Sequence, residues 1–266
     1  MMNRWSWLCP WLAIALAAAV FMLFGLTWWS ALLAAFLLVC PALLLWGLFD
    51  IRPKSDEPAV HTHGMIMDWA APFYDVYCRA VGLGQGFRDQ TLQVAAIRAG
   101  ETILDVGCGS GVLTRRAGEA AGPAGSAIGI DPGQDMIRVA KENAQRLGSR
   151  AAFKVAAIEQ LPFENARFDV VLSSLMLHHL PSDLKRQGLR EVYRVLKPGG
   201  RFVVADFYRP ANPLWWLVAC PFLFMPTTAD NFHGTLPDYF REAGFAPVQD
   251  KGRRAGILAF WSAIKP

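Results

Sequence analysis

The sequence Ile103-Leu-Asp-Val-Gly-Cys-Gly-Ser-Gly111 decides the fold of this chain of 266 residues. It begins with four residues typical of a buried β-strand and ends with glycine at every second position. The following stretch, Val112 to Ala121, has the apolar spacing of a helix. A strand, a glycine-rich turn and a helix in this order predict an α/β domain, because glycine lets the backbone turn tightly and approach a ligand closely.

The spacing of the glycines distinguishes between two classes of nucleoside ligand. A dinucleotide site needs a third glycine where this chain has Val112, so that the pyrophosphate can meet the helix N-terminus. Asp105 would repel a pyrophosphate, but it would attract the ammonium and sulfonium groups of S-adenosylmethionine. The turn therefore favours S-adenosylmethionine as the cofactor, bound by Asp105, Gly107, Gly109 and Gly111.

A second strand is predicted from Ala127 to Ile130, and it ends in Asp131. A carboxylate at that strand end can accept hydrogen bonds from both hydroxyls of a ribose. We therefore assign Asp131 to ribose binding. A role in capping the helix predicted from Gln134 to Leu147 is compatible with this assignment.

Three further motifs follow the glycine-rich turn in order: Gly129-Ile-Asp131-Pro, Leu161-Pro-Phe163 with Phe168-Asp169, and Arg194-Val-Leu-Lys-Pro-Gly-Gly200. With the turn, they resemble class I S-adenosylmethionine-dependent methyltransferases, and most of all the quinone-biosynthesis C-methyltransferases and the type 11 group. The resemblance covers residues 65–266. It implies a Rossmann-like methyltransferase fold, in which a seven-stranded, mostly parallel sheet has helices on both faces and an antiparallel last strand.

The same resemblance implies roles for single residues. Tyr74 lies in a Tyr-Asp pair similar to one that closes over the cofactor in the family, although it could equally well pack this segment on the domain. The family usually has an aspartate for the adenine amino group where this chain has Ala157. We expect the backbone of Ala157 and Ile158 to hold adenine instead, or the contact to be absent. Ser173, at the end of the fourth predicted strand, completes the cofactor set.

Two histidines follow that fourth strand, where open α/β sheets place their chemistry. His178 or His179 is a candidate base for a hydroxyl or an acidic carbon of the methyl acceptor. A histidine that only caps the loop is an equally reasonable interpretation. The Asn-Pro-Pro-Tyr motif of amino-group methyltransferases is missing here, which disfavours adenine or glutamine as the acceptor.

The first fifty residues differ in composition from the rest of the chain. No residue between Arg4 and Asp50 carries a charge, and a helix of that length would cross the ~30 Å hydrocarbon layer twice. We therefore expect two transmembrane helices, near Trp7 to Gly25 and Trp29 to Phe49. A cleaved signal peptide is less consistent with the sequence, because a second apolar stretch follows the first directly.

The predicted organisation is a transmembrane hairpin (residues 1–50), a linker (51–64) and a methyltransferase domain (65–266). Basic residues lie before and after the hairpin but not in its turn. This pattern predicts a multi-pass protein of the inner membrane, with the catalytic domain and both termini on the cytoplasmic side.

The stretch from Pro213 to Pro226 is uncharged, but it is too short and too rich in proline to span a membrane. The family has a lid over the acceptor pocket at this place, and packing in the core is the alternative. An apolar lid on a membrane-anchored enzyme predicts a small apolar or lipid-like acceptor, and the resemblance favours one of the quinone type.

Composition argues against several other partners. The net charge of +4 is dispersed, so no basic stripe for a nucleic acid is present. The five cysteines form no close pair, and His61 and His63 have no further ligands nearby, so we expect no metal site.

Three alternative functions remain open. A phospholipid head-group N-methyltransferase would share all these features. A nicotinamide-dependent oxidoreductase would share the turn and Asp131 but would have the third glycine of the dinucleotide motif. A membrane-tethered binding module without catalysis is conceivable because of Ala157.

Overall fold

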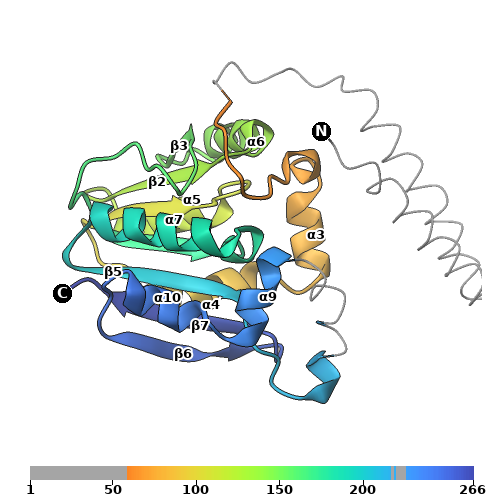
Figure 1. Cartoon of the computed structure of the whole chain (residues 1–266). Helices are drawn as coiled ribbons and strands as arrows, with labels where there is room; N and C mark the ends of the chain where they lie inside the picture. The colour runs from red at the N-terminus through yellow and green to blue at the C-terminus, as the bar shows by residue number, and fades with distance from the viewer. Residues whose placement is uncertain (1–58, 217–218, 220–225) are drawn as a thin grey trace, which may run out of the picture. The chain divides into compact units, whose positions relative to one another are not determined.

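A seven-stranded sheet forms the centre of the computed structural model, which describes residues 59–216, 219 and 226–266 (Figure 1). The strand order is β3-β2-β1-β4-β5-β7-β6, and β7 is the antiparallel strand. The strands are β1 (Thr102–Val106), β2 (Ser126–Asp131), β3 (Ala152–Val155), β4 (Phe168–Ser174), β5 (Leu196–Phe207), β6 (Val248–Arg254) and β7 (Leu258–Ile264). The predicted Rossmann-like sheet with an antiparallel last strand is confirmed.

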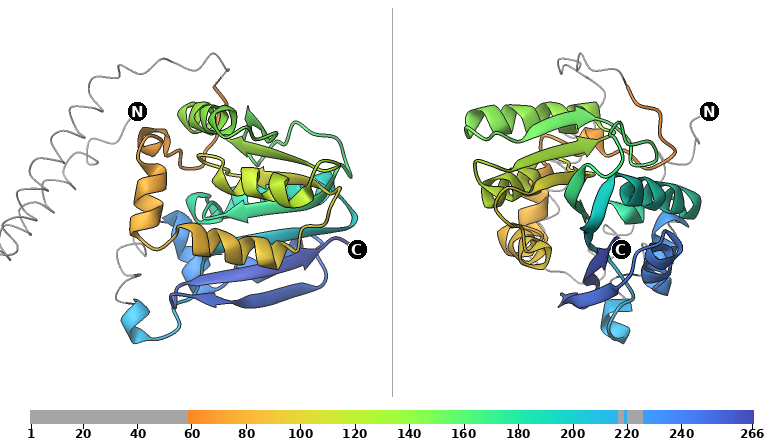
Figure 2. Two further views of the ribbon diagram at one scale, coloured as in Figure 1. Left: turned by 180° about the vertical axis from the view of Figure 1, so that it is seen from behind. Right: turned by 90° about the vertical axis from the view of Figure 1, so that its left-hand side faces the viewer.

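Helices cover both faces of this sheet. Figure 1 shows α7 (Ser182–Val195) and α10 (Leu236–Glu242) in front of it, and the reverse view in Figure 2 shows α4 (Gln85–Ala95) and α5 (Val112–Ala121) on the other face. The remaining helices are α3 (Tyr74–Ala80), α6 (Gln134–Arg146) and α9 (Pro226–His233), with the short 3-10 helices η1 (Asp68–Ala70) and η2 (Leu177–His179).

The alternation of side chains along the central strands explains the two layers. In β1, Leu104 and Val106 belong to the apolar core beneath α7 and α10, whereas Ile103 belongs to the core beneath α4 and α5. Successive residues of a strand point to opposite faces, so a strand that is apolar throughout is buried on both. The carboxyl ends of the parallel strands consequently meet at one edge, where the turn after β1 lies.

One strand begins earlier than the sequence predicts. The Pro-Gly-Gly sequence at residues 198–200 is typical of a turn, but β5 already begins at Leu196. The two glycines are paired with the chain after β7, because the N–H of Gly199 donates to the carbonyl of Lys265, and the N–H of Lys265 donates to that of Gly200. Gly199 itself keeps a φ of 75°. A bulge opposite Phe168 absorbs the extra residues.

No helix within the described residues is long and apolar enough to cross a membrane. The two transmembrane helices predicted from the sequence fall within residues 1–50, which lie outside the described part of the chain. The hairpin therefore stays a prediction.

The last glycine of the turn after β1 is a packing residue. Gly111 precedes α5 with a φ of 76°, and a Cβ atom there would lie 2.5 Å from Cε1 of Phe153 and 3.0 Å from Cβ of Ala140. Gly111 thus lets the start of α5 approach β3 and α6, whose apolar side chains form one cluster.

Replacing this glycine tests that account. Gly111→Ala should lower the free energy of unfolding by about 2–5 kcal/mol, the sum of roughly 1–2 kcal/mol for a left-handed residue and roughly 1–3 kcal/mol for overpacking. Gly148→Ala is the matched control, because Gly148 has a φ of 62° with no atom within 4 Å of the added Cβ. It should cost only about 1–2 kcal/mol. Urea unfolding that gives equal losses would contradict the packing role.

Candidate cofactor site

Two adjoining cavities lie at the carboxyl ends of β1, β2 and β4. They share Tyr74, Gly107 and Leu175 as lining residues, and their volumes of about 690 and 400 Å³ include space that is open to solvent. Of the predicted cofactor residues, six line these cavities: Tyr74, Asp105, Gly107, Gly109, Asp131 and Ile158. That they bind the cofactor stays a prediction.

Asp131 is held by the backbone at the edge of the larger cavity. Its Oδ2 accepts from the N–H of Gly109 at 3.0 Å, and its Oδ1 accepts from the N–H of Gly133 at 2.9 Å. Burial raises the pKa of Asp131 to about 6, although these two donors act in the opposite direction. Each carboxylate oxygen has a second lone pair, so Asp131 can still accept from the two hydroxyls of a ribose.

The smaller cavity contains a buried carboxylate with one unused oxygen. Oδ2 of Asp105 accepts from the hydroxyl of Thr114 at 2.6 Å, whereas Oδ1 is buried without a hydrogen-bond partner among the described residues. Burial, together with the charge of Asp131, raises the pKa of Asp105 to about 7. A buried acceptor of this kind requires a donor. The ammonium group of S-adenosylmethionine fits this requirement.

Arg88 lines the same cavity and was not predicted from the sequence. Its Nη2 lies 3.6 Å from Oδ1 of Asp75, and its side chain is largely buried. With Asp105, it gives the cavity one positive and one negative group, which suits the two charges of an amino-acid end. In the sequence, Arg88 is one charge in an ordinary helix, so no local pattern identifies it.

Tyr74 joins the two cavities. Its ring faces Gly109, where an added Cβ atom would lie 3.3 Å from Cε1 of the tyrosine. Burial raises the pKa of the Tyr74 phenol, which therefore stays neutral. The adjacent Asp75 accepts from the hydroxyl of Ser110 at 2.6 Å and so fixes α3 against the glycine-rich turn.

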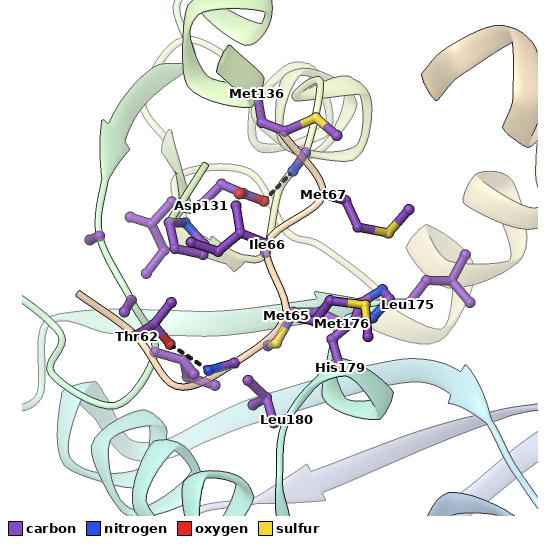
Figure 3. Close-up of a pocket in the computed structure, with 18 of the residues that line it drawn as sticks. Thr62, Met65, Ile66, Met67, Asp131, Met136, Leu175, Met176, His179 and Leu180 are labelled. Carbon is purple, nitrogen blue, oxygen red and sulfur yellow. Dashed lines mark hydrogen bonds between the residues drawn. The ribbon is translucent and has the colours of Figure 1, made fainter. Parts of the chain in front are cut away.

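The stretch from Thr62 to Met67 forms a wall of the larger cavity, although the sequence suggested a linker for its first residues. Figure 3 shows it crossing the cavity, with Asp131 on one side and His179 on the other. Two hydrogen bonds fix it. The N–H of Met65 donates to the carbonyl of His179 at 3.1 Å, and Oδ1 of Asp68 accepts from the N–H of Met136 in the first turn of α6 at 3.1 Å.

The adenine end contains a carboxylate that was not predicted from the sequence. Ala157 and Ile158 line the larger cavity as expected, but Glu159 lines it too. Oε2 of Glu159 is buried and has no hydrogen-bond partner among the described residues. Glu159 can therefore take the place of the aspartate that the family resemblance led us to seek at position 157.

Two predicted cofactor residues line neither cavity. Gly111 packs against Phe153, as described above. Ser173 is fully buried in β4, and its neighbour Ser174 lines the smaller cavity instead. The reason is the alternation of side chains, which sends the two serines to opposite faces of the sheet.

The two histidines differ in their surroundings. His179 lines the larger cavity, and its Nδ1 is buried without a partner among the described residues. Burial and the neighbouring His178 lower the pKa of His179 to about 3, so its imidazole is neutral. An imidazole with so low a pKa is a poor base at neutral pH.

His178 lines neither cavity, but its ring lies against that of His179, with 4.0 Å between the centroids. Its Nδ1 lies 2.7 Å from Oδ1 of Asp206. Burial alone would raise the pKa of Asp206, but His178 and the N–H of Phe207 hold it below its usual value. A carboxylate at this distance favours a proton on Nδ1, so in the neutral imidazole the lone pair of Nε2 is free to accept a proton.

The chain resembles known methyltransferases. A family model described as a methyltransferase domain matches residues 103–200. The ubiquinone/menaquinone biosynthesis C-methyltransferase of Ectopseudomonas mendocina is 32% identical over 208 residues, covering 70% of this chain and 80% of that protein. The demethylmenaquinone methyltransferase of Lactobacillus johnsonii is 34% identical over 169 residues, covering 62% and 67%.

A solved structure supports the fold. A SAM-dependent methyltransferase from Aquifex aeolicus superposes with a TM-score of 0.58 at 19% identity, covering 76% of this chain and 100% of that one. At this identity the likeness concerns the fold alone.

The pKa of Asp105 predicts how cofactor affinity changes with pH. Because the ammonium group needs the ionised carboxylate, affinity for S-adenosylmethionine should fall about tenfold between pH 8 and pH 6, below the pKa of about 7. The Asp105→Asn variant should bind S-adenosylmethionine more weakly at pH 8. Between pH 7 and 8, where Asp131 stays ionised, the cofactor affinity of the variant should depend on pH much less than that of the unmodified protein. Calorimetric titration measures both effects, and an unchanged pH profile in the variant would exclude the contact.

Glu159 provides a second test. Glu159→Gln should weaken S-adenosylmethionine binding by about 1.5–3 kcal/mol, the range for a hydrogen bond to a charged group. Glu164→Gln is the control, because Glu164 is exposed and lines neither cavity. If both variants bind equally well in calorimetry, adenine is held by the backbone alone.

Proposed function

We propose that this chain, which belongs to the class I S-adenosylmethionine-dependent methyltransferases, methylates an apolar ring compound of the quinone type. The methyl group goes to a ring carbon of this acceptor. Three observations support it. The chain is similar to a ubiquinone/menaquinone C-methyltransferase and to a demethylmenaquinone methyltransferase, and its N-terminal stretch is uncharged. In addition, a buried histidine is paired with a carboxylate beside the cofactor site. The last observation carries the proposal, because a carbon acceptor must lose a proton.

S-adenosylmethionine supplies, when bound, a methyl group on a positively charged sulfur that leaves as a neutral thioether. The protein's part is to position the acceptor and to accept its proton. As the new carbon–carbon bond forms, the ring hydrogen leaves as a proton. We assign its uptake to Nε2 of His178, which requires the acceptor to reach this ring beside the cavity-lining His179, 4.0 Å away between centroids. Asp206 stabilises the resulting imidazolium, because its carboxylate lies 2.7 Å from Nδ1. Neutral His179 places no positive charge in the cofactor cavity.

The sequence supports a membrane location as part of this proposal. The uncharged stretch between Arg4 and Asp50 would hold the catalytic domain at the cytoplasmic face of the inner membrane, where a lipid-like acceptor is concentrated. The lid predicted from Pro213 to Pro226 is part of the proposal, although its residues 217–218 and 220–225 lie outside the described part of the chain. Leu214 in this stretch is exposed, and Trp215 packs on Gly256, where an added Cβ atom would overlap its indole.

Lipid analysis tests the class of acceptor. Extracts of a strain that lacks the gene should contain a quinone-type lipid lighter by one methyl group than the parent's, and the purified full-length protein should convert it. Accumulation of a phospholipid with an under-methylated amine would establish the head-group N-methyltransferase instead.

The two histidines can be separated by kinetics. His178→Gln should lower kcat for the quinone-type acceptor by roughly 10²–10⁴, the typical contribution of a general base, with unchanged cofactor affinity. His179→Gln should lower it much less, because the pKa of His179 is too low for a base. Activity with solubilised acceptor and calorimetry with the cofactor give the two readouts. Equal losses in both variants would assign the base elsewhere.

A further inference from the structure

Four large apolar side chains are exposed in and next to the segment formed by η1 and α3. Trp69, Val76, Tyr77 and Val81 have exposed fractions of 68, 58, 59 and 49%. Trp69 lies in η1, Val76 and Tyr77 lie in α3, and Val81 follows its last residue. We call these four residues the outer face of α3. Isolated exposed apolar residues are common, but several so close together in the chain are typical of a binding surface.

The inner side of the same segment is also apolar and contacts the cofactor site. Tyr74 and Cys78 line the smaller cavity, and Cys78 is buried. A short helix that is apolar on both sides needs a second apolar environment for its outer side. Figure 1 shows α3 at the end of the sheet where the cofactor site lies.

The charges of this segment point away from the outer face. Asp68 accepts from the N–H of Met136, and Asp75 is bound by Ser110 and Arg88. Both carboxylates therefore lie against the domain. The remaining charge on α3 is the cation Arg79, whose Nε donates to the carbonyl of Asp75. A face with tryptophan, tyrosine and valine, no carboxylate and one arginine suits the interface of a bilayer with anionic lipids.

The position of the segment in the chain identifies the occupant. The uncharged stretch ends at Phe49, and nineteen residues, 50–68, separate it from Trp69. Even fully extended, this connection spans at most roughly 70 Å, so a domain tethered by residues 1–50 stays close to the membrane. We propose that the outer face of α3 lies in the headgroup region of the bilayer that anchors the chain. The inference rests on the membrane anchoring included in the proposed function.

The proposed docking explains how an apolar acceptor reaches the site. With the outer face in the lipid interface, the inner side of the same helix closes the cofactor cavities through Tyr74. The acceptor then enters from the bilayer without crossing water. The helical residues 213–216, which include exposed Leu214, lie at the same end of the sheet in Figures 1 and 2 and offer a second contact.

Photocrosslinking in the full-length protein tests the docking directly. The photoreactive residue p-benzoylphenylalanine replaces Val76 in one variant and Leu147, an equally exposed residue at the end of α6, in the control. Both proteins are reconstituted into vesicles of phosphatidylethanolamine and phosphatidylglycerol and irradiated. We expect lipid adducts at position 76, several times more abundant than at position 147.

Each other outcome overturns the proposal in a recognisable way. Adducts from position 76 to a second copy would make the face a dimer interface, and adducts to residues 1–58 would make it an internal contact. A protein that floats with the vesicles but gives no lipid adduct excludes docking and leaves the anchoring intact. A protein that does not float with them excludes the anchoring itself.

A kinetic test adds a second readout. Val76→Glu with Tyr77→Glu places two carboxylates on the outer face, away from both cavities. Turnover of acceptor in vesicles should fall several-fold, while turnover of detergent-solubilised acceptor and cofactor affinity stay unchanged. Leu147→Glu should change none of these. Equal turnover in vesicles by the double variant and the unmodified protein would overturn the docking.

Discussion

The cost of burying two carboxylates at neighbouring strand ends governs the structure around the site. Asp105 is the last residue but one of β1, and Asp131 is the last residue of β2. Burial raises the pKa of both carboxyls, and the charge of Asp131 raises that of Asp105 further. The turn between them makes this tolerable: its backbone N–H at Gly109 serves Asp131, and the helix that follows provides the hydroxyl of Thr114 for Asp105. The close approach of α5 at Gly111 is thus part of the same electrostatic arrangement.

The part of the site proposed for the methyl acceptor has a different requirement, because a base must remain available there to take up a proton. Two adjacent histidines share one buried environment, yet only His178 has a carboxylate beside it. Asp206 is itself held by backbone N–H groups, with Leu177 donating to Oδ2 at 2.8 Å and Phe207 to Oδ1 at 2.7 Å. These donors keep Asp206 ionised. His178 therefore has an ionised carboxylate beside it, whereas burial and the neighbouring His178 lower the pKa of His179.

Local patterns predicted the fold well, since a strand, a glycine turn and a helix are short-range features. The predicted α5 and the residues at the ends of β1 and β2 agree with the structure. The sequence could not show which of Ser173 and Ser174 lines the cavity, because the face of the sheet that a residue occupies depends on strand register. Arg88, Glu159 and the wall from Thr62 to Met67 join the site through contacts distant in sequence, such as that of Asp68 with Met136. The adenine-side aspartate was sought at one fixed position, whereas a carboxylate two residues later reaches the cavity.

The wall from Thr62 to Met67 also bears on the timing of the catalytic cycle. It is closed by the hydrogen bonds of Met65 with His179 and of Asp68 with Met136. If the cofactor binds behind this wall, its exchange has to break these two hydrogen bonds, and opening of this kind limits turnover in many enzymes.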